Sequence, residues 1–345
     1  MDLEKSRRLR GFCRELGRAG VLLRRRSNIA WITDGADVHC DTGQATGVAA
    51  VLWTPRRQVV LTNTIEAPRL RAEEFGKDWS FDVVDWWRDR GMPRRGFATD
   101  WPDDKDGIAS LRASLTDREV ARARELGSEC AELMQAYLQR VRRGVSEHEV
   151  AGAFGAALRA RGIQAPVLLV AADDRVARFR HPIPTHRRVE KLLMLVVCAQ
   201  RHGLIVAMTR LVHFGRISPA LAEKHVAVCA VDETLIDATR PGADWSAVLA
   251  AGVRAYRDQG FAKEWKLHHQ GGPMGYEGRD FCVTPTTPGK VVAPQMVGWN
   301  PSITGTKSED TILTRAVGRA PEILTAMTDW PMLGRRPDIL VRSGR

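Results

Sequence analysis

Three apolar runs in the middle of the chain constrain its fold more than any other feature. They are "PVLLVAA", "LLMLVVCAQ" and "LIVAMTRLVHFG", and they lie within residues 166–215. Runs of this length, rich in valine, leucine and isoleucine, are typical of buried strands. Three such strands close together in the sequence predict the central sheet of a large domain.

Amphipathic helices are predicted on both sides of these strands. Two of them carry a capping-box signature, Thr116 with Glu119 and Ser146 with Glu149. In a capping box the hydroxyl and the carboxylate each accept a hydrogen bond from a free backbone N–H of the first helical turn. Two more helices are expected over residues 218–230 and 244–259. The predicted order in this part of the chain is therefore two helices, three strands and two helices, with the strands in between.

The first third of the chain has a different pattern of predicted helices and strands. Residues 3–19 are predicted to form a helix, "GVLLRRRSNIAWIT" two short strands, and "VAAVLWTPRRQVVLTN" a hairpin around a Pro-Arg-Arg turn. The segment 88–108 is rich in proline, glycine and charge, as linkers are. We therefore expect an α+β protein with a smaller domain at residues 1–108 and a larger one at residues 109–345.

The composition is that of a soluble globular protein, with 44% hydrophobic and 27% charged residues. No apolar run approaches the roughly 20 residues of a membrane helix. The beginning, "MDLEKSRRLRGF", lacks the apolar segment of a signal peptide. The six cysteines are scattered without a CxxC pair, which favours reduced thiols and a cytoplasmic location.

The net charge of +11 raises the question of nucleic-acid binding. The arginines are spread along the chain, and their short clusters contain no interleaved aromatic residues and no known nucleic-acid motif. We therefore expect neither a nucleic-acid partner nor a membrane partner. The positive charge favours a small anionic substrate through long-range attraction.

Four polar segments follow one another in the second half: "RFRHPIPTHRRVEK", "AMTRLVHFG", "HHQGGPMGY" and "WNPSITGTKSEDTILT". In order and spacing they resemble the motifs of the pita-bread fold shared by methionine aminopeptidase, prolidase, aminopeptidase P and creatinase. The resemblance covers roughly residues 113–320, and the first third is similar to the small N-terminal domain of creatinase-type members. It implies a homodimer, because that domain often covers the site of a neighbouring subunit.

The metallopeptidases of this fold hold two metal ions with two aspartates, one histidine and two glutamates. The resemblance places these ligand positions on Val196 or Cys198, Ala207, His269, Asn300 and Glu309. Alanine and valine have no donor atom, and asparagine is a neutral, weaker ligand. We therefore expect no dinuclear centre, no metal ligand and no cofactor.

A pita-bread protein without metal can still be an enzyme. Creatinase lacks metal and cleaves a C–N bond with a histidine in the loop that His181 matches. The resemblance implies His181 as the acid and base, His269 as a hydrogen-bond donor to a substrate carbonyl, and Glu309 as the group that orients a histidine. The alternatives are a structural loop histidine and a buried Glu309 paired with Lys307 or Arg210.

Further polar and aromatic residues are candidates for substrate binding. Arginines flank the motifs, and their planar side chains bind carboxylates in a bidentate manner. The candidate set is Arg178, Arg180, Arg210, His268, Tyr276, Trp299, Asn300 and Lys307. Tyrosine and tryptophan could instead be packing residues, and asparagine a turn residue. In an extended segment only one of the adjacent histidines would reach the pocket, and the motif favours His269.

These observations predict a metal-independent hydrolase or lyase. It would act on a C–N bond of a small, anionic, amino-acid-like substrate by histidine-centred acid–base catalysis. One alternative is an Xaa-Pro-type metallo-aminopeptidase, which needs the metal that the ligand positions argue against. The other is a non-catalytic pseudo-peptidase that serves as a binding module, as histone-chaperone relatives of the fold do.

Overall fold

The computed structural model describes residues 2–89, 91–92 and 95–343. It separates into two compact units, one made of Met1–Glu119 with His202–Leu204, the other of Val120–Arg201 and Ile205–Arg345. The sequence-based boundary was placed between residues 108 and 109. Each unit is described by itself.

The first unit is built on a five-stranded sheet with the strand order β4-β3-β2-β1-β5. The predicted hairpin is present, with β2 and β3 antiparallel and Trp53 opposite Gln58. The predicted first helix is also present, and the Asp2 carboxylate caps it by accepting from the backbone N–H of Glu4 and of Lys5. The strands and helices are β1 (Gly20–Arg25), β2 (Thr46–Trp53), β3 (Gln58–Asn63), β4 (Ser80–Val84), β5 (Phe97–Thr99), α1 (Leu3–Glu15), α2 (Arg26–Ile32), α3 (Ala67–Arg69), the π-helix η1 (Leu70–Glu74) and the 3₁₀ helix η2 (Ile108–Arg112).

One prediction for this unit is wrong. Only the first half of "GVLLRRRSNIAWIT" is a strand, and the second half is the helix α2. The Asp100 carboxylate accepts hydrogen bonds from the backbone N–H groups of Arg24 and Arg25 and from the Asn28 side chain. These bonds occupy donors at the end of the strand and fix a polar side chain in the first turn of the helix. The distant aspartate therefore overrides the local strand preference.

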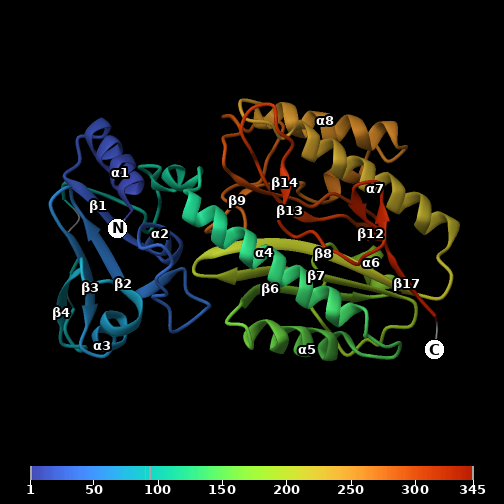
Figure 1. Ribbon diagram of the computed structural model, residues 1–345, viewed down its shortest axis with the longest axis horizontal. Helices are drawn as coiled ribbons and strands as arrows, with labels where there is room; N and C mark the ends of the chain where they lie inside the picture. The colour runs from blue at the N-terminus through green and yellow to red at the C-terminus, as the bar shows by residue number, and fades with distance from the viewer. Residues whose placement is uncertain (1, 90, 93–94, 344–345) are drawn as a thin grey trace. The chain divides into compact units, whose positions relative to one another are not determined.

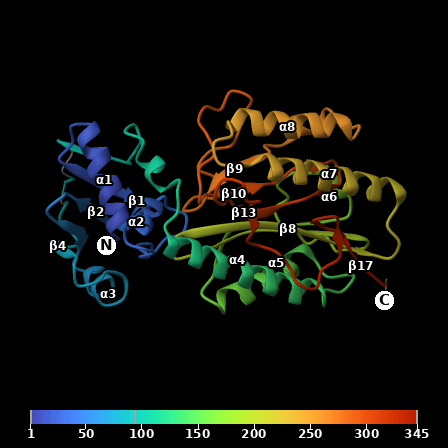
Figure 2. The ribbon, with the colours of Figure 1, turned by 45° about the horizontal axis from the view of Figure 1, so that its top comes forward.

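The second unit contains the three predicted strands in a sheet with the order β17-β8-β7-β6. Figures 1 and 2 show α4 and α5 on one side of this sheet and α7 and α8 on the other. Both predicted capping boxes are formed, at Thr116 with Glu119 and at Ser146 with Glu149. The elements are β6 (Gln164–Ala172), β7 (Leu192–Arg201), β8 (Leu204–Phe214), β17 (Leu340–Arg342), α4 (Asp117–Leu138), α5 (Glu147–Arg159), α7 (Pro219–Ala238) and α8 (Trp245–Asp258).

A tight turn sets the register of the β7–β8 hairpin. Its two residues, His202 and Gly203, both have positive φ, as the two-residue hairpin turn requires. At the other end of the hairpin the Phe214 N–H donates to the Lys191 carbonyl at 2.7 Å. This register places Cys198 opposite Ala207.

The second unit has another, shorter sheet with the order β14-β13-β10-β9. It lies between the β17-β8-β7-β6 sheet and the helices α7 and α8 (Figure 1). Loops and short elements around it carry most of the predicted site residues. They are α6 (Asp174–Arg178), the 3₁₀ helix η3 (Glu264–Leu267), β9 (Gly271–Met274), β10 (Met296–Trp299), β11 (Ser302–Ile303), β12 (Thr306–Lys307), β13 (Asp310–Leu313), β14 (Glu322–Ile323), β15 (Met332–Leu333) and β16 (Arg336–Pro337).

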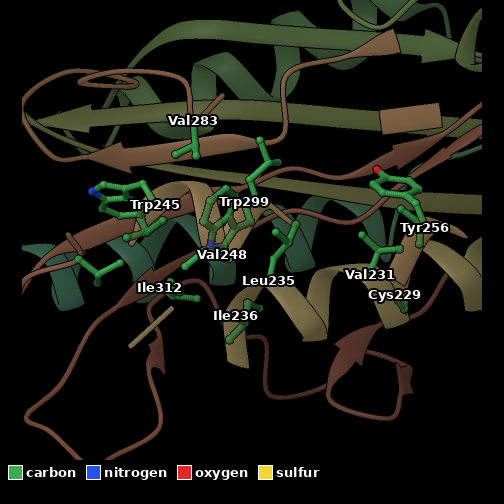
Figure 3. Close-up of a cluster of buried hydrophobic side chains, with 14 of the residues drawn as sticks. Cys229, Val231, Leu235, Ile236, Trp245, Val248, Tyr256, Val283, Trp299 and Ile312 are labelled. Carbon is green, nitrogen blue, oxygen red and sulfur yellow. The ribbon is translucent and has the colours of Figure 1, made fainter. Parts of the chain in front are cut away.

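A core of aromatic and aliphatic side chains joins α7 and α8 to the second sheet. Trp245, Trp299, Leu235 and Ile312 all belong to it, and Figure 3 shows them side by side. Leu235 and Ile312 are completely buried. Burial of side chains of this size contributes about 1.5–3 kcal/mol each. The core therefore gives the loops on this sheet a rigid base.

The described part of the chain contains no helix that is long and apolar enough to cross a membrane. All six cysteines lie in that part as free thiols.

Candidate functional site

Three histidines converge in the second unit. Each of His181, His268 and His269 offers one ring nitrogen, and these three nitrogens lie within 4.8 Å of one another. The Nε2 atoms of His181 and His268 are 3.1 Å apart, within hydrogen-bond distance. The ring centres of His268 and His269 are separated by 4.5 Å. We call these three residues the histidine cluster.

The cluster brings together two loops that are distant in the sequence. His181 follows α6, whereas His268 and His269 lie between η3 and β9. The expectation that only one of the adjacent histidines reaches the site is wrong. The Gln270 side-chain amide donates to the carbonyls of Trp265 and His268, which folds the backbone here away from a regular strand. Both rings therefore face His181.

The surroundings keep the histidines neutral. Burial, followed by the positive charge of Lys307, lowers the pKa of His268 to about 3. Burial and the nearby Arg279 lower the pKa of His269 to about 4. The more exposed His181 also has a lowered pKa, through burial and then Lys307. At neutral pH the cluster therefore offers lone pairs rather than positive charge.

A buried charged group lies next to the cluster. The Lys307 Nζ is 2.7 Å from Glu309 Oε2, and the Arg279 Nη2 is 3.3 Å from Glu309 Oε1. The Thr209 hydroxyl donates to Glu309 Oε2 at 2.6 Å. Burial raises the pKa of Glu309, but the two cations and the hydrogen bonds outweigh it and lower the pKa to about 2. Glu309 is thus an ionised carboxylate, and its predicted alternative partner Lys307 is present.

Cys198 and Ala207 occupy facing positions on the hairpin beside this group. Burial and the charge of Glu309 raise the pKa of Cys198 to about 11. The side chain is therefore a thiol at neutral pH. This environment disfavours the thiolate form that a nucleophilic cysteine needs. The resemblance left the first aspartate position open between Val196 and Cys198. Cys198 is the one opposite Ala207, whereas Val196 packs in an apolar cluster with Met194.

The residues present do not fit a dinuclear, carboxylate-held metal centre. Both oxygens of Glu309 are already bonded to side chains of the chain, two of them cationic. The facing hairpin positions carry a thiol and a methyl group. Two close divalent cations need several anionic oxygen ligands, and Glu309 is the one carboxylate that the five ligand positions retain.

Arg178 and Arg180 have partners of their own. Arg178 is exposed and lies 3.3 Å from Asp174. The Arg180 Nη2 is bonded to Glu264 at 2.8 Å and to the Thr304 hydroxyl at 2.9 Å. These contacts tie the loop of His181 to the β11–β12 region. Each of these contacts uses one guanidinium nitrogen of its arginine, so other N–H donors of both side chains are left for a ligand.

Arg210 is not available to a ligand, contrary to the expectation. It is 1% exposed, and its Nη2 donates to Asp310 Oδ1 at 2.8 Å. Arg336 donates to the other oxygen of Asp310 at 2.6 Å and lies 2.7 Å from Asp232. These partners could not be predicted from the sequence around Arg210, because they come from β13, β16 and α7. Arg210 is part of a buried ion-pair network that joins these elements.

The two aromatic candidates are packing residues, as their alternative interpretation predicted. Trp299 is 1% exposed, belongs to the core in Figure 3, and its Nε1 donates to the Thr239 hydroxyl. Tyr276 is also 1% exposed, and its hydroxyl accepts from Arg122 at 2.9 Å. Asn300 is buried, and its Oδ1 has no hydrogen-bond partner among the described residues.

Sequence reasoning missed two residues of the charged group. Arg279 lies in "YEGRD" and Thr209 in "AMTR", directly beside motifs that the sequence analysis used. The sequence did contain a signal for a residue such as Arg279. Glu309 is retained where other metal-ligand positions are substituted, and a buried carboxylate without a metal needs a cationic side chain nearby. Nothing in the sequence distinguishes the role of Thr209 from that of an ordinary strand residue.

The fold and the arrangement of these loops define a pita-bread protein of the peptidase type. The model of metallopeptidase family M24 matches residues 121–316, and the chain belongs to this family. No curated protein matches the sequence.

Solved structures agree with this fold over nearly the whole chain. An Xaa-Pro dipeptidase from Bacillus anthracis is 17% identical, with a TM-score of 0.74 and 99% of each chain covered. A prolidase from Pyrococcus horikoshii OT3 is 16% identical, with a TM-score of 0.75, 94% of this chain and 99% of that chain covered. The N-terminal domain of the FACT complex subunit SPT16 from Cicer arietinum is 11% identical, with a TM-score of 0.70, and covers 94% and 97%. At these identities the similarity establishes the fold alone.

The lowered histidine pKa values predict an acid-sensitive fold. A histidine whose pKa is lower in the folded state stabilises the fold less as the pH falls below the unfolded pKa of about 6.5. The unfolding free energy of the parent protein should therefore fall when the pH is lowered from 7 to 5. In His268→Gln this fall should be smaller by about 1 kcal/mol, after allowance for partial solvent exposure. Urea unfolding at the two pH values measures this. His186→Gln, an exposed histidine, is the control, and an equal loss in all three proteins would contradict the prediction.

Proposed function

We propose that the protein is a metal-independent hydrolase or lyase that acts on a C–N bond of a small, anionic, amino-acid-like substrate. Membership of family M24 supports a hydrolase with a pita-bread fold. The observation that carries the finer proposal is the pair of neutral imidazoles, His181 and His268, hydrogen-bonded at 3.1 Å beside a carboxylate neutralised by side-chain cations. Such a pair can accept and return a proton without a metal-bound water.

In the hydrolytic form of the reaction His181 acts first as a base. It takes a proton from a water molecule while the water oxygen forms a bond to the substrate carbon. The proton then passes to the nitrogen, the C–N bond breaks, and the histidine is neutral again. His269 donates a hydrogen bond to the oxygen on that carbon, where negative charge develops. Glu309 stays ionised and fixes Lys307 and Arg279 beside the histidines.

The charge of the site favours an anionic substrate. Lys307 and Arg279 carry two positive charges against the single negative charge of Glu309, so the group keeps one net positive charge. A substrate carboxylate can complete this balance. We therefore propose Lys307, Arg279 and His268 as the residues that bind the substrate carboxylate, with Arg178 and Arg180 at the edge of the loop.

The test is hydrolysis by chelator-treated protein. N-acyl and amidino derivatives of amino acids are assayed beside their carboxamide counterparts, with chelator present. We expect turnover of carboxylate-bearing compounds that chelator does not reduce. A ligand present at about one hundred times its Kd adds about 2.7 kcal/mol of stability, so the carboxylate forms should also raise Tm by several degrees more than the carboxamides.

Two results would contradict the proposal in different ways. Activity that disappears with chelator and returns with added metal would favour an Xaa-Pro-type metallo-aminopeptidase. No turnover and no stabilisation by any small molecule would favour a binding module, which the similarity to the SPT16 domain makes a real alternative for this fold. We further propose that the protein is a homodimer, which light scattering of the purified protein can check, and that it is cytoplasmic, which cell fractionation can check.

A further inference from the structure

We infer that the histidine cluster binds one transition-metal ion of the zinc type through three imidazole nitrogens, and that this ion inhibits the enzyme. The binding part is independent of the proposed function. The inhibition part rests on it, because it assumes that His181 works as a metal-free base. The site differs from the five-ligand set discussed above, of which it contains only His269.

The geometry of the cluster is close to that of a metal site. In a tetrahedral zinc site the metal–nitrogen distances are about 2.0–2.1 Å, which separates two ligand nitrogens by about 3.3 Å. The Nε2 atoms of His181 and His268 are 3.1 Å apart, and the third histidine contributes an atom within 4.8 Å of both. To direct three nitrogens at one point, the His269 ring has to approach the other two by up to about 1.5 Å, from 4.8 Å to the spacing of a tetrahedral site.

Two ring nitrogens lack a protein partner. The Nδ1 atoms of His268 and His269 are buried and have no hydrogen-bond partner among the described residues. An unsatisfied buried polar atom costs about 1–3 kcal/mol. An ion bound at His269 Nδ1 would remove one such cost, whereas an ion at His268 Nε2 leaves the Nδ1 of that ring as it is. The Gln270 amide holds the carbonyl of His268 and thereby fixes the backbone that carries both rings. The cluster is thus partly organised before any ion arrives.

The donor set selects the kind of ion. Three neutral imidazoles suit zinc, cobalt, nickel or copper, whereas magnesium, calcium and manganese prefer oxygen ligands. Glu309 is held by Lys307 and Arg279 and adds no ligand. The net positive charge of that group repels a dication, so we expect reversible binding rather than a permanently loaded site. Three protein ligands also leave a fourth position for water.

A bound ion and the proposed catalysis exclude each other at His181. The lone pair that would accept a proton from water is the one that a metal would occupy. The hydrogen bond between His181 and His268 is lost for the same reason. Zinc should therefore lower the hydrolysis rate in proportion to the occupancy of the cluster.

Cobalt titration tests the binding. Co²⁺ is added to chelator-treated protein, and the visible absorption of tetrahedral cobalt is followed, with zinc used to displace it. We expect one cobalt per chain. Loss of one ligand should weaken binding by about tenfold or more in His181→Asn and in His268→Asn, since the loss of a mere outer-shell partner already costs 10–100-fold. His186→Asn is the matched control, because this exposed loop histidine is paired with His148 instead.

The outcomes separate the two parts of the inference. No cobalt absorption, or absorption that survives both ligand substitutions, overturns the site. A sulfur-to-cobalt charge-transfer band that disappears in Cys198→Ser also overturns it, because the ligand is then the hairpin thiol. Binding at the cluster with a fall in the zinc-treated hydrolysis rate supports both parts. If the ion binds at the cluster and the hydrolysis rate rises with zinc, the metal site is supported, but the inhibition and the metal-independent function are both overturned. Chelator-resistant hydrolysis without any cobalt binding leaves that function intact.

Discussion

Glu309→Gln is expected to destabilise the second unit by about 3–5 kcal/mol, because it leaves two cations buried without their carboxylate. Lys307 and Glu309 are 6% and 3% exposed at their side chains, and Arg279 is 13% exposed. The ionised form of Glu309 is the one that the fold stabilises, as its lowered pKa indicates. Urea denaturation at pH 7 measures the change in unfolding free energy.

A double-mutant cycle shows whether the loss comes from unpaired charge. Lys307→Met removes one cation, so the double variant Lys307→Met/Glu309→Gln should be less destabilised than the sum of the two single variants. Asp258→Asn removes the acid of an exposed pair with Arg257 and should change stability by about 0–1 kcal/mol. Additive losses in the cycle would show that the pair is not coupled.

His181→Asn is expected to lower kcat/KM for the C–N cleavage about 10²–10⁴-fold, the usual contribution of one acid–base group. The ring of His181 is the exposed one of the cluster, so its removal should leave Tm nearly unchanged. A fall in kcat without a fall in stability is a result that a merely structural histidine would not give. The measurement is steady-state kinetics with the best substrate of the carboxylate panel.

The control is again His186→Asn, in the same loop. It removes another exposed ring, which makes an edge-to-face contact with His148 at 4.7 Å between ring centres. Its rate should equal that of the parent protein. If His181→Asn and His186→Asn both hydrolyse the substrate at the rate of the parent protein, His181 has no role in the chemistry. The acid–base proposal is then wrong.

Local sequence rules predicted much of the framework. The strand runs, the hairpin in the first unit and both capping boxes depend on residues close together in the sequence, so propensity and spacing are sufficient. The order of the four polar segments was also enough to indicate the fold, and the family match confirms it.

What could not be predicted depends on contacts between distant segments. The helix α2 needs Asp100, and the burial of Arg210 needs the carboxylate of Asp310. The convergence of both adjacent histidines needs the turn that Gln270 holds. In each case the deciding partner is remote in the sequence or acts through a backbone shape that periodicity does not describe.

The ion pair between Lys307 and Glu309 has a consequence for how this protein matures. A site that depends on an external ion for its charge balance is complete only after the cell has delivered that ion. Here the compensating charge is encoded two residues before the carboxylate, so it is present as soon as the chain is synthesised. The proposed metal-independent function therefore predicts that starvation for metals leaves the abundance of the folded protein unchanged.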